Sequence, residues 1–130
     1  MGERLPEKVR TLADAPTYVT LATLQSDGSP RLTVLWIERD GDDLLLSTVR
    51  GRAKERDIDR DPRVALMFLD QHDPYSYVEI RGTATLTEEG GRDLIDRLAV
   101  KYTGEPYKWD GPDAIRVVIR ISPTRVLTTG

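Results

Sequence analysis

Hydrophobic and polar positions follow a helical period at the start of the chain. Leu5, Val9 and Leu12 are separated by four and three residues, so they form one apolar stripe of a helix. Proline disfavours continuation of a helix, and Pro16 follows this stripe. The pattern therefore predicts a helix over residues 3–13.

The period then changes to the alternation typical of β-strands. Residues 18–24, 32–37 and 43–48 are rich in Val, Thr, Leu and aromatic side chains, which favour strands. Residues 26–29 and 40–42 contain Asp, Ser and Gly, which are typical of tight turns. Three antiparallel strands in quick succession are expected.

The middle of the chain predicts a short helix and two further strands. Residues 52–61 contain no Gly or Pro and precede Pro62, which indicates a helix that ends there. Residues 63–69 contain a continuous apolar run, so we expect a strand that is buried on both faces. Residues 77–86 alternate, so one face of that strand should contact the core and the other should contact water or a partner.

The last third of the chain predicts a helix, a loop and a final strand. Thr87 is a candidate N-cap for a helix with an apolar side made by Leu94, Ile95, Leu98 and Tyr102. Residues 103–113 contain two Gly and two Pro and predict a loop, and residues 115–121 alternate as a strand that Pro123 ends or bends. Six mostly adjacent strands with few helices indicate a mainly β protein, a small six-stranded antiparallel barrel in one domain over residues 1–130.

Composition excludes several classes of site. The 130 residues include 38% hydrophobic and 32% charged residues, which fits one folded core. Cysteine is absent and His72 is the single histidine, so we expect no disulfide, no thiolate nucleophile and no metal site. No motif supports His72 as a general base.

Residues 1–10 lack the apolar region of an export signal, and no apolar run is long enough to span a bilayer, so a cytoplasmic protein without membrane contact is expected.

Charge is unevenly placed. The net charge is −3, yet residues 50–63 hold six cations and four anions. An acidic protein disfavours nonspecific binding to nucleic acid. A small basic region in such a protein indicates a small anionic partner.

The basic region coincides with a predicted strand-to-helix junction. Ser47 and Thr48 end the strand, and Arg52 and Lys54 open the helix, where unpaired N–H groups and the positive end of the helix dipole favour an anion. A phosphate site is one interpretation. A solvated helix of mixed charge is the other, and the residues alone leave both open.

Residues 33–36 could border a flat ligand beside the anion site. Their strand should neighbour the one that ends at Thr48, so an aromatic ring attached to a bound phosphate could lie along it. Ordinary half-buried strand residues are the alternative. Tyr107 and Trp109 lie on a loop long enough to cover a pocket, although such residues also anchor loops or subunit interfaces.

Three consecutive segments resemble the signature of the pyridoxamine phosphate oxidase-like split β-barrel flavoproteins. They are the strand over residues 44–48, residues 51–58 and residues 60–64. The deazaflavin-dependent branch is the most similar. Further matches cover residues 28–30, 79–82, 102–104 and 121–126.

The resemblance implies an FMN-binding type of split β-barrel that forms a homodimer with two cofactor sites at the subunit interface. The implied phosphate ligands are Thr48, Arg52 and Lys54, with Ser47 and Ala53 beside them. The ring would be bordered by Thr33, Val34, Leu35 and Trp36. Tyr77 or Trp109 would approach it from the other subunit.

The implied activity is that of an oxidoreductase using coenzyme F420, with hydride transfer to or from a small organic substrate. The cofactor carries the hydride, so no catalytic acid or base is needed. The same fold with FMN, as an oxidase or reductase, is an alternative. A noncatalytic module that binds a cofactor or haem is a second alternative.

Two positions depart from the family pattern. Asp57 stands where the family commonly has asparagine, which places a negative charge near the expected phosphate. Authentic pyridoxamine phosphate oxidases carry an Arg-x-His pair near the C-terminus, whereas Leu127 stands two residues after Arg125 here. Oxidation of vitamin B6 is therefore disfavoured.

Overall fold

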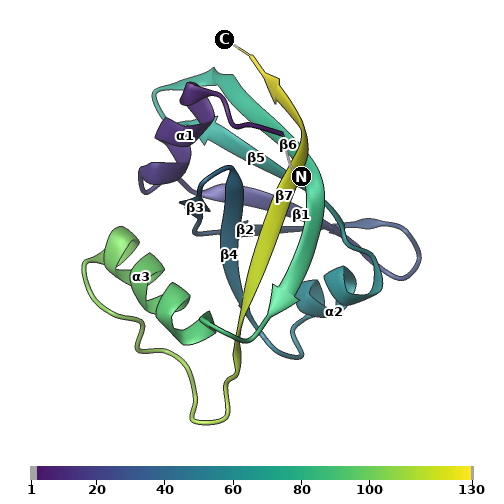
Figure 1. Ribbon diagram of the computed structural model, residues 1–130, viewed down its shortest axis with the longest axis vertical. Coiled ribbons are helices and arrows are strands. Elements are labelled where there is room, and N and C mark those ends of the chain that lie inside the picture. The colour runs from purple at the N-terminus through teal and green to yellow at the C-terminus, as the bar shows by residue number, and fades with distance from the viewer. Residues whose placement is uncertain (1–2, 130) are drawn as a thin grey trace.

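The computed structural model describes residues 3–129, in which seven strands form one curled antiparallel sheet accompanied by three helices (Figure 1). The strands are β1 (Val19–Leu24), β2 (Pro30–Leu35), β3 (Glu38–Asp40), β4 (Asp43–Val49), β5 (Arg63–Asp70), β6 (Asp73–Thr87) and β7 (Arg116–Thr128). The helices are α1 (Glu7–Asp14), α2 (Ala53–Arg60) and α3 (Gly91–Thr103). The domain predicted over residues 1–130 includes residues 1, 2 and 130, which lie outside the described part. None of the helices within residues 3–129 is long and apolar enough to cross a membrane.

The strand order explains how the sheet curls. It runs β2-β1-β5-β6-β7-β4-β3, and every pairing is antiparallel. The edge strand β2 ends at Leu35 and the opposite edge strand β3 begins at Glu38, so only Trp36 and Ile37 connect the two edges. This short connection requires the edges to approach one another, which gives a split barrel.

The mainly β, antiparallel split barrel is thus confirmed, with a corrected strand count. The structure has seven strands rather than six in residues 3–129, and β2 and β3 do not pair to close the sheet. The additional strand β3 consists of Glu38, Arg39 and Asp40. Three polar residues carry no apolar alternation, so the sequence pattern could not reveal this strand.

Strand β7 continues through Pro123 and bends there. The register between β6 and β7 shifts between Arg81 and Gly82, and Pro123 lies opposite Gly82. A Cβ atom at Gly82 would lie 2.5 Å from the backbone oxygen of Ser122, so only glycine permits this close approach. The sequence-based end at residue 121 was therefore too early.

The main core lies inside the curl of the sheet. Val78, Ile80 and Ala84 on alternate positions of β6 are buried, which confirms the predicted alternation. Helix α1 adds Val9 and helix α2 adds Ile58 to the same cluster. Both helices thereby pack against the core that the curled sheet encloses.

The prediction that β5 is buried on both faces was wrong for this chain. Met67 and Leu69 on its outer face are exposed. Their neighbours on the other side of β1 are Leu32 and Val34 of the edge strand β2, which are 69% and 65% exposed. We call these four residues the β2–β1–β5 face, an apolar sheet surface that nothing within residues 3–129 covers.

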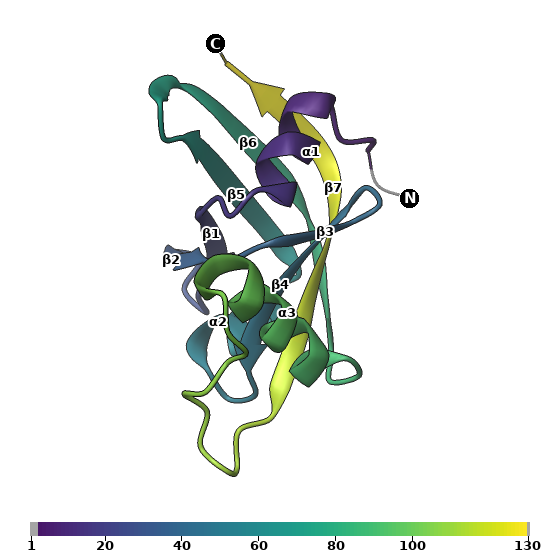
Figure 2. The ribbon, with the colours of Figure 1, turned by 90° about the vertical axis from the view of Figure 1, so that its left-hand side faces the viewer.

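Helix α3 covers the opposite part of the sheet, over β4 and β7 (Figure 2). It begins at Gly91 and not after Thr87, which is the last residue of β6. A Cβ atom at Gly91 would lie 2.1 Å from the carbonyl oxygen of Arg116, so glycine lets the helix start directly against β7. A second small core forms under α3 from Leu45, Leu94, Leu98 and Val118, with Trp36 and Tyr102 packed against it.

Candidate functional site

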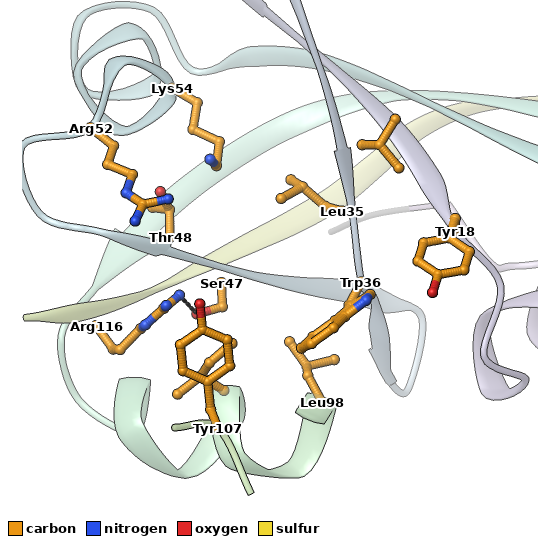
Figure 3. A pocket seen from close by; sticks show the side chains of 12 residues that line it. Tyr18, Leu35, Trp36, Ser47, Thr48, Arg52, Lys54, Leu98, Tyr107 and Arg116 are labelled. Atoms are coloured by element: carbon orange, nitrogen blue, oxygen red, sulfur yellow. Dashed lines mark hydrogen bonds between the residues drawn. The ribbon is translucent and has the colours of Figure 1, made fainter. Parts of the chain in front are cut away.

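A cavity of about 230 Å³ lies where the barrel is split. Edge strand β2 and the connection after it form one wall, and β4 with the start of α2 forms another (Figure 3). Helix α3 and the loop that follows it complete the lining. The lining residues are Tyr18, Val34, Leu35, Trp36, Ser47, Thr48, Arg52, Lys54, Ile95, Leu98, Tyr107 and Arg116.

Most residues predicted for the site meet in this cavity. The structure brings together Val34, Leu35, Trp36, Ser47, Thr48, Arg52 and Lys54. Thr33 and Ala53 are their chain neighbours but do not line the cavity. Trp109 is exposed on the loop after α3, and Tyr77 lies on β6 opposite Leu69, so neither lines the cavity of its own chain. Their predicted approach from a second subunit stays a prediction.

The turn between β4 and α2 builds the cationic end of the cavity. Gly51 has φ +95°, which allows the chain to reverse between Val49 and Arg52. Arg52 is the N-cap of α2, but no side chain caps the first turn. The carboxylate of Glu55 accepts the backbone N–H of Gly51 at 3.0 Å and stays outside the cavity lining. The N–H groups at the start of α2 therefore remain available to a ligand.

Thr48 and Lys54 are buried there without partners. The Oγ1 atom of Thr48 is the one buried side-chain polar atom within residues 3–129 that has no hydrogen-bond partner. Lys54 is 9% exposed, and its ammonium group forms no ion pair with any residue between 3 and 129. Burial lowers the pKa of Lys54, and the nearby charges of Arg52 and Arg116 lower it further. An anion would pair with both groups, so these residues fit a bound phosphate.

Arg116, at the start of β7, is a third cation in the cavity that the sequence did not predict as a site residue. Its Nε and Nη2 atoms donate to the two carboxylate oxygens of Asp110, both at 2.7 Å, and Nη1 donates to Oγ of Ser47 at 3.2 Å. The ring of Tyr107 lies 4.6 Å from the guanidinium carbon. Sequence alternation placed Arg116 on a polar strand face, but α3 covers that face and buries it.

Aromatic residues form the other end of the cavity. Trp36 stacks on Tyr102 with ring centroids 5.3 Å apart, and Tyr107 meets Trp36 edge-on at 6.3 Å. The Tyr102 hydroxyl accepts the N–H of Ile37 and donates to the carbonyl of Thr17. Burial raises the pKa of Tyr102, so its ionisation is disfavoured further. Trp36 is thus held in one orientation as a flat apolar wall.

Asp57 does not line the cavity. Its carboxylate accepts hydrogen bonds from Thr23 at 2.8 Å, Arg31 at 2.8 Å and Arg60 at 2.9 Å. Burial alone would raise the pKa of Asp57, but the hydrogen bonds from Arg31 and Thr23 and the charges of Arg31 and Arg60 outweigh it and lower the pKa. Two guanidinium groups therefore compensate the negative charge that the sequence places near the anion site.

A split antiparallel barrel with a cationic pocket in its split defines the class of pyridoxamine 5'-phosphate oxidase-like proteins. The sequence profile of the family described as pyridoxamine 5'-phosphate oxidase matches residues 5–130. The chain belongs to this family.

Solved structures agree with this assignment. An F420 reductase is 31% identical, with a TM-score of 0.83, and the match covers 95% of this chain and 98% of that one. A conserved hypothetical protein from Mycobacterium tuberculosis is 25% identical, with a TM-score of 0.80 and coverage of 98% and 86%. General Stress Protein 26 from Bacillus anthracis has 21% identity, a TM-score of 0.72 and coverage of 95% and 92%, and this likeness supports the fold alone.

Proposed function

We propose that the chain is an oxidoreductase that uses coenzyme F420 and transfers a hydride between the deazaflavin and a small organic substrate. The observation that carries the proposal lies at the uncapped start of α2, where the buried Thr48 hydroxyl has no hydrogen-bond partner and the largely buried Lys54 side chain turns an ammonium without an ion-pair partner toward the cavity. Such groups are costly to bury unless a ligand pairs with them. Similarity to an F420 reductase over nearly the whole chain supports F420 as that ligand.

The residues divide the work along the cavity. Thr48, Arg52 and Lys54 would bind the phosphate, with Ser47 beside them, and the strand from Val34 to Trp36 would border the ring. The bound deazaflavin supplies the hydride chemistry. The cavity lining contains no carboxylate and no imidazole, so the role of the protein is to position the reacting groups and to exclude water.

A second copy of the chain would complete the site. Ligand pockets usually have volumes of roughly 300–1,000 Å³, and the cavity is smaller at about 230 Å³. Val34 lines the cavity and also belongs to the exposed β2–β1–β5 face, so the cavity opens beside an apolar surface. Tyr77 lies directly opposite Leu69 and therefore shares that side of the sheet. A homodimer through this face is the arrangement that we propose, with Tyr77 or Trp109 of one subunit approaching the ring in the other.

FMN is the alternative cofactor, since a phosphate site built from Thr48, Arg52 and Lys54 suits either molecule. A noncatalytic carrier is the second alternative, because the cavity lining contains no carboxylate and no imidazole. Vitamin B6 oxidation stays disfavoured, since no histidine follows Arg125. A cytoplasmic location remains a prediction.

Titration of the purified protein with F420 and with FMN tests the proposal. We expect F420 to bind in the micromolar range or tighter, measured as a saturable decrease in fluorescence. FMN should bind more weakly. Reversed preference would favour the FMN alternative, and failure of both cofactors to bind would refute the proposal. Oxidation of reduced F420 by a panel of small unsaturated or quinone-type acceptors then separates an enzyme from a carrier.

A further inference from the structure

We propose that Arg116 is a positioning residue of the anion site, which orients the Ser47 hydroxyl so that its proton points to the bound phosphate. This inference rests on the proposed function, because it assumes that the phosphate of a cofactor occupies the cavity. It adds a residue and a hydrogen bond that the sequence signature does not contain.

The hydrogen bonds of Arg116 determine the direction in which the Ser47 proton can point. Asp110 accepts hydrogen bonds from Nε and Nη2 of Arg116. Nη1 remains and donates to Oγ of Ser47, which Figure 3 marks with a dashed line. A guanidinium group can only donate, so the Ser47 oxygen must accept. The Ser47 proton is then available, and it has no acceptor among residues 3–129. Because Ser47 lines the cavity beside Thr48, an anionic oxygen there would be its acceptor.

Asp110 and Tyr107 hold the Arg116 guanidinium in one orientation. The side chains of Arg116 and Asp110 are 6% and 7% exposed, and their two hydrogen bonds form a bidentate pair. The Tyr107 ring packs against the same guanidinium. A guanidinium held on one edge and one face cannot turn freely, so the bond to Ser47 is kept in place before a ligand arrives.

Charge alone does not explain this arrangement. Asp110 compensates the Arg116 charge at 2.7 Å, while Lys54 has no such partner. The attraction of Arg116 for an anion is therefore reduced by Asp110, and its hydrogen bond to Ser47 is the contact that reaches into the cavity. A purely structural role in fixing the loop after α3 is the competing explanation.

Arg92 provides a matched control. It donates to the same Asp110 carboxylate at 2.9 Å, but its side chain is 48% exposed and does not line the cavity. Both Arg92→Gln and Arg116→Gln remove one positive charge that faces Asp110, with one hydrogen bond lost in the first variant and two in the second. Only Arg116→Gln removes the contact with Ser47.

The experiment is a double-mutant cycle on cofactor affinity. Dissociation constants are measured for whichever of F420 and FMN the unmodified protein binds, in Ser47→Ala, Arg116→Gln, the double variant and Arg92→Gln. We expect each of the first two to weaken binding at least about 10-fold, the lower end of the range of one hydrogen bond to a charged group. The double variant should be about as weak as Arg116→Gln alone, because the two changes remove one arrangement. Arg92→Gln should stay within about 2-fold of the unmodified protein, as surface ion pairs contribute little.

Additive effects of Ser47→Ala and Arg116→Gln would overturn the inference, as would equal losses in Arg92→Gln and Arg116→Gln. In either case the unmodified protein still binds its cofactor, so the proposed function survives. Absence of binding by the unmodified protein refutes both. Arg116→Lys, which keeps the charge, covers the case in which Arg116→Gln does not fold: continued weak binding supports positioning, and full affinity would show that charge suffices.

Discussion

Replacing Lys54 by methionine separates function from stability, because the two effects have opposite signs. The Lys54 side chain is largely buried and its ammonium has no ion-pair partner within the described residues, so the unliganded protein loses no ion pair when the charge is removed. The free energy of unfolding should stay the same or increase. The methylene groups of methionine keep most of the apolar packing of the lysine stem.

Cofactor affinity should fall in the same variant. A hydrogen bond to a charged group contributes about 1.5–3 kcal/mol, which corresponds to a dissociation constant raised by about 10- to 150-fold. Fluorescence titration with F420 or FMN measures this change, and urea unfolding followed by tryptophan fluorescence measures stability. Lys108→Met is the control, since Lys108 is an exposed lysine outside the cavity and should change neither quantity.

The pH dependence of stability gives a further readout of the same group. Burial, followed by the charges of Arg52 and Arg116, lowers the pKa of Lys54 below 10.5 in the folded protein. Between the lowered pKa and 10.5 the unfolded chain binds more protons, so Lys54 adds stability as pH rises through this window. This rise should be smaller in Lys54→Met. Reduced stability with unchanged affinity would show that Lys54 is structural and that the phosphate binds elsewhere.

Three further changes test the anion site, the proposed dimer and the role of Asp57. Thr48→Val removes the hydroxyl without a partner, so we expect cofactor affinity to fall at least about 10-fold, the lower end of the range of one hydrogen bond to a charged group, and calorimetry to show no loss of thermal stability. Leu32→Glu places a charge in the β2–β1–β5 face and should shift the protein from dimer to monomer in sedimentation velocity, whereas Val100→Glu, on an exposed position of α3, should not; a monomeric unmodified protein would contradict the proposed interface. Asp57→Asn should lower the free energy of unfolding in urea by about 1–3 kcal/mol, because two arginines lose their charged acceptor, and should change cofactor affinity less than Lys54→Met does; a tighter complex would show that the Asp57 charge opposes the phosphate.

The part of the site carried by one continuous segment could be predicted from the sequence. Ser47, Thr48, Arg52 and Lys54 lie within eight residues, so the strand-to-helix junction alone brings them together. The prediction that the strand of residues 33–36 neighbours the one that ends at Thr48 was wrong, because β2 pairs with β1 whereas β4 pairs with β7 and β3. Val34 to Trp36 face Ser47 and Thr48 across the cavity and not along a shared ladder.

Residues that reach the cavity through tertiary packing could not be predicted. Arg116 meets Ser47 because β7 pairs with β4, with Val49 opposite Arg116, across a long sequence separation. Its burial depends on α3, which packs over a strand face that alternation marks as polar. Tyr107 depends on the path of an irregular loop. No local pattern encodes these placements, although an arginine next to a Pro/Gly-rich loop was a weak signal.

The exposed face of β5 is another feature that the local sequence pattern could not predict. A continuous apolar run predicts burial, but the run itself does not say whether the cover comes from the same chain or from another. Met67 and Leu69 are open to solvent in a single chain. A continuous apolar run therefore predicts an apolar surface and does not by itself predict what covers that surface.

A ligand bound in the split would also restrain the two sides of the barrel relative to one another. Within the described residues the edge strands β2 and β3 are connected only by Trp36 and Ile37 and do not pair. A molecule that contacts Leu35 of β2 and Thr48 of β4 would bridge the open side of the barrel. Backbone amides of β2 and β4 would then exchange with solvent more slowly and in concert, although the two strands share no ladder. The barrel would owe its closure to its ligand and not to a hydrogen bond between its edges.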